Sequence, residues 1–189
     1  MSIKQLQQKY LEKKHWQNHP TKYAEDFSIF LKSKKFNDLV VDIGCGSGRD
    51  VNTFANFGFR SLGIDVSEKE IVLAKNKFPT LNFEVQNAES LNFSNNSLGA
   101  FFTINVIHFL NQKKALNEIF RTLKPGGYLF IHFNLLIKDN SGEVDYSQDI
   151  KEALSLVSKF KILSQKTFER EDTEPIKHKH KILELILMK

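Results

Sequence analysis

Three closely spaced glycines follow a β-branched apolar run and give the sequence its clearest chemical signal. The segment reads Val40-Val41-Asp42-Ile43 and then Gly44-Cys45-Gly46-Ser47-Gly48. Because glycine has no Cβ, its backbone can adopt positive φ and let a ligand contact the N–H groups of the turn. The dinucleotide fingerprint is G-x-G-x-x-G, with a pyrophosphate on the helix N-terminus, whereas the spacing here is G-x-G-x-G. The tighter turn therefore predicts a nucleoside ligand without a pyrophosphate.

An acidic residue and a polar turn follow the next two predicted strands. Asp65 lies 21 residues after Gly44, an offset at which a carboxylate can accept hydrogen bonds from both hydroxyls of a ribose. Its alternative role is to cap the helix that follows it. The turn Asn87-Ala88-Glu89 comes after the third strand, and Asn87 could also be a turn residue alone. The joint occurrence of these segments with the glycine turn favours the functional interpretation.

Alternating strands and helices must position these residues. We expect strands at Leu39–Ile43, Arg60–Ile64, Leu81–Gln86, Ala100–Asn105 and Tyr128–Phe133. We expect helices at Ile3–Lys14, Lys22–Ser33, Ser47–Phe57, from the Ser67–Glu70 capping box to about Lys77, from an Asn111 cap to Leu123, and at about Gln148–Lys159. A polar stretch covers Lys138–Ser147. Strands near Lys161–Arg170 and His178–Met188 are joined by a connection too short for a crossover helix, which predicts an antiparallel hairpin.

The order and spacing of these segments carry a family resemblance over about Leu39–Phe133. The glycine turn, Asp65, Gln86–Glu89 and Leu123–Ile131 together resemble the class I S-adenosylmethionine-dependent methyltransferases, of the type 11 or 25 kind. The resemblance implies a Rossmann-like α/β fold with N-terminal helices and a mostly parallel sheet of seven strands, in the order 3-2-1-4-5-7-6 with a C-terminal antiparallel hairpin. Residues 1–189 would form a single methyltransferase domain, with a helical cap over 1–37 and the Rossmann-like core over 38–189.

The same resemblance implies S-adenosylmethionine as cofactor and S-adenosylhomocysteine as product. The cofactor's amino acid portion would lie on Gly44–Gly48, its ribose on Asp65, and its adenine beside Val66 and the Asn87 turn. The full set of implied cofactor residues is Asp42, Gly44, Cys45, Gly46, Ser47, Gly48, Arg49, Asp65, Val66, Asn87, Ala88, Glu89, Asn105 and Val106. Two positions depart from the family pattern, since Asn87 replaces the usual acidic residue and Leu98-Gly99 stands where Phe-Asp is usual.

Catalytic residues are harder to assign, because methyl transfer from a sulfonium needs mainly that two reactants are positioned and water is excluded. His108 could act as a general base for a hydroxyl or amine acceptor, or could be a half-buried structural histidine. A weaker similarity to tellurite-resistance methyltransferases, in which hairpin groups hold a small anion, points to Arg170, although Glu169 stands where a histidine would be expected. His178 and His180 share one face of a strand, but without Cys or a convergent carboxylate in the sequence pattern we expect no metal site.

Composition restricts the classes of partner and compartment. The chain has 189 residues, 41% hydrophobic and 26% charged, and no apolar run of the length that a membrane span needs. A single cysteine and an N-terminus without an apolar signal region predict a cytoplasmic protein that does not act at a membrane. The net charge is +5, but the lysines are scattered, which argues against a nucleic-acid partner.

The function predicted from the sequence is methyl transfer to a small-molecule substrate, by a monomer or homodimer. Two alternatives stay open. One is an RNA or protein methyltransferase that docks through the lysine-rich N-terminal helices, and the other is a module that binds S-adenosylmethionine without catalysis.

Overall fold

The computed structural model describes residues 21–172 and 177–189, in which one mixed sheet forms the centre of the fold. Its main path runs in the order β3-β2-β1-β4-β5-β8-β7. The strands are β1 (Leu39–Ile43), β2 (Arg60–Asp65), β3 (Asn82–Val85), β4 (Leu98–Thr103), β5 (Leu123–Asp139), β7 (Lys161–Asp172) and β8 (His178–Met188). The pairs among β1 to β5 on this path are parallel, and β8 is antiparallel to both β5 and β7. The predicted α/β class, strand order and C-terminal hairpin are confirmed.

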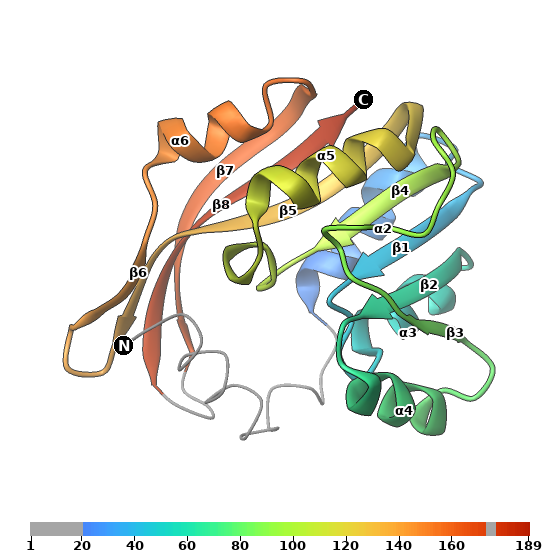
Figure 1. Cartoon of the computed structure of the whole chain (residues 1–189), viewed down its shortest axis with the longest axis horizontal. Helices are drawn as coiled ribbons and strands as arrows, with labels where there is room; N and C mark the ends of the chain where they lie inside the picture. Colours follow the sequence, from blue (N-terminus) through green and yellow to red (C-terminus); the bar gives the residue numbers. More distant parts are fainter. Residues whose placement is uncertain (1–20, 173–176) are drawn as a thin grey trace.

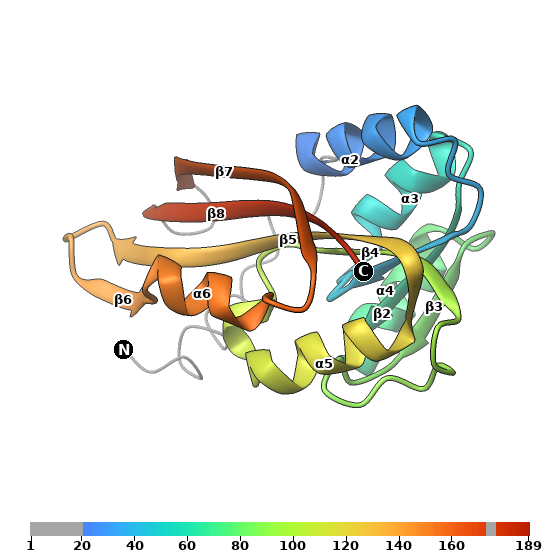
Figure 2. The ribbon, with the colours of Figure 1, turned by 90° about the horizontal axis from the view of Figure 1, so that it is seen from above.

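Helices cover both faces of the sheet, as the two perpendicular views show (Figures 1 and 2). On one face α2 (Lys22–Ser33) and α3 (Arg49–Asn56) pack over an aromatic core that includes Phe27, Phe54, Phe102 and Phe130. The other face is covered by α5 (Gln112–Thr122) and α6 (Ile150–Leu156). The helix α4 (Glu68–Lys77) packs against β3 through a smaller cluster. Strands buried on both faces explain the continuous apolar runs in the sequence.

Helix caps fix where several helices begin. Thr21, Ser67 and Asn111 each accept a hydrogen bond from a backbone N–H in the first turn, at the starts of α2, α4 and α5. The predicted bounds of α2 and the cap of α5 are confirmed. The first crossover helix starts at Arg49 and not at Ser47, because Gly48 adopts φ 86° at the N-cap. The chain therefore enters α3 through the glycine turn.

The region after Phe133 differs most from the prediction. There β5 continues to Asp139, because β8 pairs with it from Tyr128 to that residue. No strand was expected in the polar stretch Lys138–Ser147. Its end nevertheless forms an eighth strand, β6 (Val144–Ser147), which pairs antiparallel with β5. A short exposed edge strand has little apolar alternation, so it leaves a weak sequence signal.

Other bounds shift by a few residues. The fourth strand ends at Thr103 and not at the predicted Asn105, and α6 is shorter at both ends than the predicted helix. The predicted helix Ile3–Lys14 lies outside the described residues, and the division of the chain at residue 38 stays a prediction. Among the described helices, none combines the length and the apolar character that crossing a bilayer requires.

Candidate functional site

A cavity of about 400 Å³ lies at the carboxyl ends of β1, β2 and β4. This is where the strand order reverses between β1 and its neighbours β2 and β4, and ligands of open α/β sheets bind at such a point. The predicted cofactor residues that line it are Asp42, Gly44, Cys45, Gly46, Ser47, Arg49, Asp65, Val66, Asn87, Ala88, Glu89, Asn105 and Val106. Gly48 is absent from the lining. The structure thus brings together all but one of the residues that the family resemblance selected.

The glycine turn forms the floor of this cavity. Gly44, Gly46 and Gly48 have φ of 72°, 51° and 86°, so each adopts a conformation that L side chains disfavour. A Cβ on Gly44 would overlap the side chain of Val106, across the turn from β4. A Cβ on Gly48 would lie 2.6 Å from Phe83 Cζ. Gly48 therefore packs closely against Phe83 of β3, and it does not line the cavity.

Asp65 ties the glycine turn to the start of α4. Its Oδ2 accepts a hydrogen bond from the Gly46 N–H at 3.0 Å, and its Oδ1 accepts one from the Ser67 N–H at 2.8 Å. Asp65 therefore does have the structural role that the sequence left open, at the start of the following helix. A carboxylate has about four acceptor positions, so two remain for a ligand on the cavity wall.

Buried acidic groups and one cation lie beneath the turn. The Asp50 carboxylate accepts hydrogen bonds from Arg49 Nη2 at 3.0 Å and from the Thr21 hydroxyl at 2.9 Å, which joins α3 to the cap of α2. Burial raises the pKa of Asp42 well above its ordinary value, and the neighbouring Asp50 charge acts in the same direction. Burial likewise raises the pKa of the Cys45 thiol. A protonated thiol is a poor nucleophile, so Cys45 serves the cavity as a small side chain.

The turn after β3 offers a flat, partly apolar wall. Asn87 Oδ1 accepts a hydrogen bond from the Glu89 N–H at 2.9 Å, and Glu89 Oε1 accepts one from the Asn111 N–H at 2.8 Å. Val66 is 65% exposed although it is a large apolar residue. An exposed apolar side chain beside an ordered polar turn suits an aromatic base, which needs a face to stack on and hydrogen-bonding groups at its edge.

The far wall of the cavity is built from the segment that follows β4. Asn105 has φ 59°, a conformation that asparagine tolerates better than most residues. Its Oδ1 accepts a hydrogen bond from Arg170 Nη2 at 3.2 Å. The hairpin residue Arg170 is thus anchored to the cavity wall, although it does not itself line the cavity.

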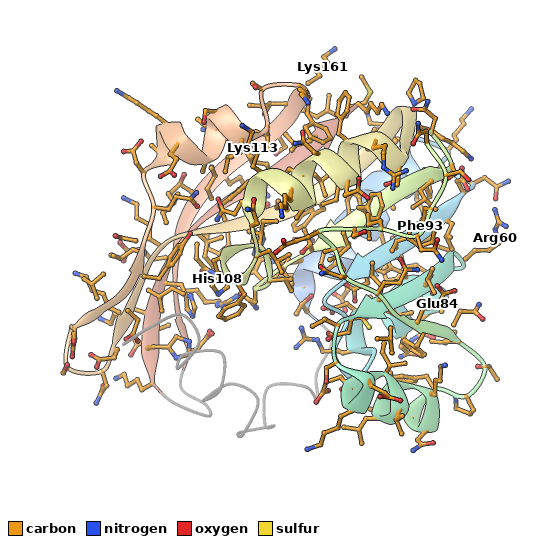
Figure 3. The ribbon with its side chains drawn as sticks, viewed as in Figure 1. Arg60, Glu84, Phe93, His108, Lys113 and Lys161 are labelled. Atoms are coloured by element: carbon orange, nitrogen blue, oxygen red, sulfur yellow. The ribbon has the colours of Figure 1, made fainter. Side chains whose placement is uncertain are left out.

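His108 lies in the 3₁₀ turn η2 (Ile107–Phe109), below α5 in the view of Figure 3, and is 5% exposed. It does not line the cavity, whereas the next residue, Phe109, does. Its Nδ1 lies 3.0 Å from Asn134 Nδ2, and Asn134 Oδ1 lies 2.9 Å from His180 Nδ1. Burial and the neighbouring His180 and Arg170 lower the pKa of His108 to about 3. The imidazole is therefore neutral and a weak base near neutral pH.

Arg170 is held by an acidic neighbour on its own strand. Its Nε lies 2.8 Å and its Nη2 2.9 Å from the two oxygens of Asp172. Burial raises the pKa of Asp172, but His180 and the charge of Arg170 outweigh that effect and hold it at about 2. Asp172 is therefore ionised near neutral pH.

The sequence missed several residues of the cavity wall: Ile43, Asp50, Ile64, Ser67, Glu70, Gln86, Ile104, Phe109 and Leu110. Phe109 and Leu110 follow β4, so the strand-end rule that selected Asn105 could have selected them as well. Asn134 and Asp172 left no comparable signal, because they meet their partners only through the pairing of β5, β7 and β8.

Comparisons with known proteins agree with this geometry. A family model described as a methyltransferase domain matches residues 41–131. An uncharacterised protein of Methanocaldococcus jannaschii is 34% identical over 139 residues, which are 71% of this chain and 53% of that protein. A probable tRNA methyltransferase 9B of Mus musculus is 34% identical over 109 residues, which are 54% of this chain and 23% of that protein. The chain therefore spans about half of the first relative and about a quarter of the second.

Solved structures share the fold. An S-adenosylmethionine-dependent methyltransferase of Methanosarcina mazei superposes with a TM-score of 0.66 at 26% identity, covering 81% of this chain and 92% of that one. A TehB-like methyltransferase of Corynebacterium glutamicum gives a TM-score of 0.63 at 19% identity, covering 89% of each chain, so the weaker tellurite-type similarity appears at the level of the fold. Residues 41–131 therefore match a methyltransferase domain, and the strand order and these likenesses show the fold of the class I S-adenosylmethionine-dependent methyltransferases.

Proposed function

We propose that the protein binds S-adenosylmethionine in this cavity and transfers its methyl group to a small-molecule acceptor. The observation that carries the proposal is the position of Asp65 on the cavity wall, where one carboxylate both holds the glycine turn and keeps acceptor positions for a ribose. A cavity of about 400 Å³ falls within the range of about 300–1,000 Å³ that is usual for small-molecule and cofactor sites.

The residues present fit this cofactor by their donor and acceptor types. The N–H groups and small side chains of the glycine turn suit the amino acid portion, Asp65 suits the ribose, and Val66 with the Asn87 turn suits the adenine. A bound S-adenosylmethionine supplies a methyl group that is already activated by the sulfonium. The residues of this chain therefore have to bind, orient and exclude water, and no acid is needed for the leaving thioether.

The acceptor side is formed by the segment after β4. Asn105, Val106, Phe109 and Leu110 line the cavity there, three of them with apolar surfaces that can exclude water. We assign Arg170 to holding a polar or anionic group of the acceptor, because it already contacts Asn105. For His108 we favour a hydrogen-bonding role over base catalysis, because its imidazole is buried, neutral and weakly basic.

Calorimetric titration with S-adenosylhomocysteine tests the cofactor part of the proposal. We expect one site, with no comparable binding of a nicotinamide or flavin dinucleotide, because the turn lacks the pyrophosphate spacing. Binding of a dinucleotide in place of the adenosyl ligand would contradict the proposal. Formation of S-adenosylhomocysteine from labelled cofactor in the presence of candidate acceptors then separates an enzyme from a module that only binds.

A second candidate function is RNA methylation, favoured by the likeness to a mouse protein named as a probable tRNA methyltransferase. The labelled exposed cations Arg60, Lys113 and Lys161 lie at separate points of the molecule and form no single basic face among themselves (Figure 3). Methyl incorporation into bulk tRNA, with binding that weakens steeply as salt rises, would favour this second function over a small-molecule acceptor.

A further inference from the structure

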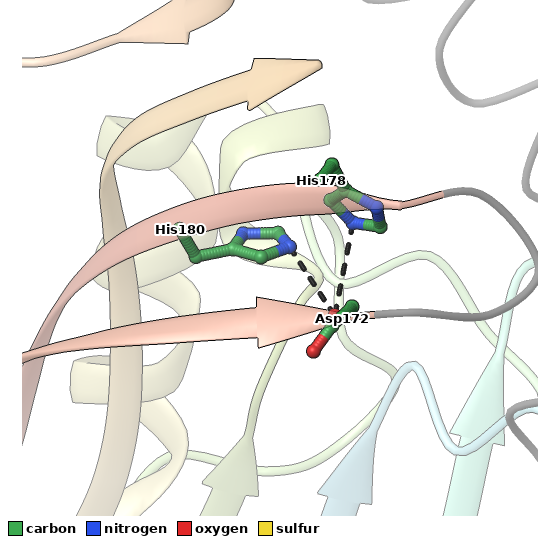
Figure 4. A group of neighbouring side chains, drawn as sticks. All are labelled: Asp172, His178 and His180. Atoms are coloured by element: carbon green, nitrogen blue, oxygen red, sulfur yellow. Dashed lines mark ion pairs between the residues drawn. The ribbon is translucent and has the colours of Figure 1, made fainter. Parts of the chain in front are cut away.

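Two histidines and a carboxylate converge at the end of the C-terminal hairpin where β7 ends and β8 begins (Figure 4). His178 and His180 are alternate residues of β8, so their side chains share one face of the strand. The register of the hairpin pairs Asp172 of β7 with His178. The sequence analysis found the two histidines on one face and expected no metal because no convergent carboxylate was evident. The hairpin register supplies that carboxylate.

The distances from Asp172 to the two histidines are close to those of a tetrahedral site. Asp172 Oδ2 lies 3.3 Å from His180 Nε2 and 3.7 Å from His178 Nε2. All three ligand atoms lie within 4.8 Å of one another. Ligand atoms about 2.0–2.1 Å from zinc at the corners of a tetrahedron are about 3.4 Å apart. The two pairs with Asp172 are near this spacing, and side-chain rotations that bring the two histidine nitrogens to it would place an ion at bonding distance from all three.

The ring of His180 is oriented as a metal-binding histidine would be. It is 4% exposed, and its Nδ1 lies 2.9 Å from Asn134 Oδ1, an atom that can only accept a hydrogen bond. His180 Nδ1 therefore donates its N–H to Asn134, and Nε2 is the ring nitrogen that faces Asp172. This buried Nε2 lies 3.3 Å from Asp172 Oδ2, and a bound ion would take the place of that contact. Donation from the second ring nitrogen to a fixed oxygen is the usual support of a histidine ligand.

Arg170 supports the carboxylate in a similar way. It pairs with both oxygens of Asp172, Nε with Oδ1 at 2.8 Å and Nη2 with Oδ2 at 2.9 Å, and so fixes the carboxylate with Oδ2 toward the two histidines. Its Nη2 reaches Asn105 on the cavity wall. One residue therefore links the histidine cluster to the wall of the cofactor cavity.

We propose that Asp172, His178 and His180 form a binding site for a divalent transition-metal ion, with zinc as the first candidate. Two imidazoles and a carboxylate form a ligand set that zinc accepts, and three protein ligands leave a fourth position for water or for an oxygen or nitrogen of another molecule. The proposal does not depend on methyl transfer, since it rests on the hairpin and on Asn134 of β5.

Zinc titration of the full-length, chelator-treated protein tests the proposal, with Asp172→Asn and His180→Asn as the disrupting variants. The matched control is Glu171→Gln, which removes a carboxylate from the adjacent, exposed position of the same strand. We expect wild type and the control to bind zinc alike, and the disrupting variants to bind at least tenfold more weakly. Asn134→Ala should weaken binding by roughly 10- to 100-fold, as loss of a ligand's supporting hydrogen bond does.

Two results would overturn the site: a wild-type protein that takes up no zinc, or equal zinc affinity in wild type, Asp172→Asn and His180→Asn. If a disrupting variant does not fold, as judged by circular dichroism, the visible spectrum of the cobalt-loaded wild type decides. Intense bands of a four-coordinate ion support the site, and the weak bands of an octahedral aqua ion exclude it.

Discussion

Replacement of Asp65 by alanine separates cofactor recognition from fold stability. The carboxylate already accepts one backbone hydrogen bond on each oxygen, from Gly46 N–H and Ser67 N–H. Each oxygen therefore keeps one acceptor position, which is what the two ribose hydroxyls of the proposed cofactor require. In Asp65→Ala both hydroxyls lose a charged acceptor, and the glycine turn loses the hydrogen bond from Gly46 N–H.

The size of the effect follows from the strength of hydrogen bonds to charged groups on a partly exposed wall. We expect affinity for S-adenosylhomocysteine to fall by about 1–3 kcal/mol, which corresponds to roughly 5- to 150-fold in Kd. The matched control is Asp149→Ala, because Asp149 also accepts two backbone N–H groups, at the start of α6, and does not line the cavity. That variant should lose about 1 kcal/mol of unfolding free energy and keep the wild-type Kd.

Calorimetric titration gives Kd, and urea denaturation without ligand gives the stability of each variant. If Asp65→Ala binds S-adenosylhomocysteine as tightly as wild type, Asp65 does not hold the ribose and the reasoning fails. If both variants lose affinity in proportion to lost stability, the effect is general and again does not support a ribose contact.

Three further predictions concern stability. Gly44→Ala should lower the free energy of unfolding in urea by about 2–4 kcal/mol, because position 44 has a positive φ and an added Cβ overlaps Val106. The second change Val106→Ala should restore part of that loss. Asp50→Ala should lower the free energy of unfolding by about 2–4 kcal/mol, because the partly buried Arg49 guanidinium and the Thr21 donors lose their acceptor. As the control, Arg60→Ala, at a side chain 76% exposed, should change it by less than about 0.5 kcal/mol in the same assay. His108 has a folded pKa of about 3, below its unfolded value, so its contribution is fully present above about pH 6.5 and is lost as pH falls towards 3. Unfolding free energy should therefore drop by about 2 kcal/mol more in wild type than in His108→Gln between pH 7 and pH 5, and equal slopes would contradict that pKa.

Local patterns were sufficient for much of the fold. The bounds of α2 (Lys22–Ser33) follow from its apolar stripe, and the start of α5 from the Asn111 cap. The strand β6 (Val144–Ser147) was missed because its pairing with β5, and not its own composition, makes it a strand. Its conformation depends on a partner that the local sequence does not reveal.

The same division holds for the candidate sites. The glycine turn and Asp65 are local signals with a known spacing, so their position in one cavity could be predicted from the sequence. Asp172 and Asn134 are separated from their partners by a hairpin register and by the pairing of β5 with β8. A shift of one residue in either register would turn these side chains to the opposite face, and no sequence pattern fixed that register in advance.

The sheet is markedly lopsided, with 17, 12 and 11 residues in β5, β7 and β8 against five in β1 (Figure 1). The short strands and their turns line the cavity, while the long strands extend beside it. Substitutions on the long strands can therefore change the surface beside the cavity while the residues that line the cavity stay unchanged. In this way one fold can serve different acceptors while its cavity for the methyl donor stays the same.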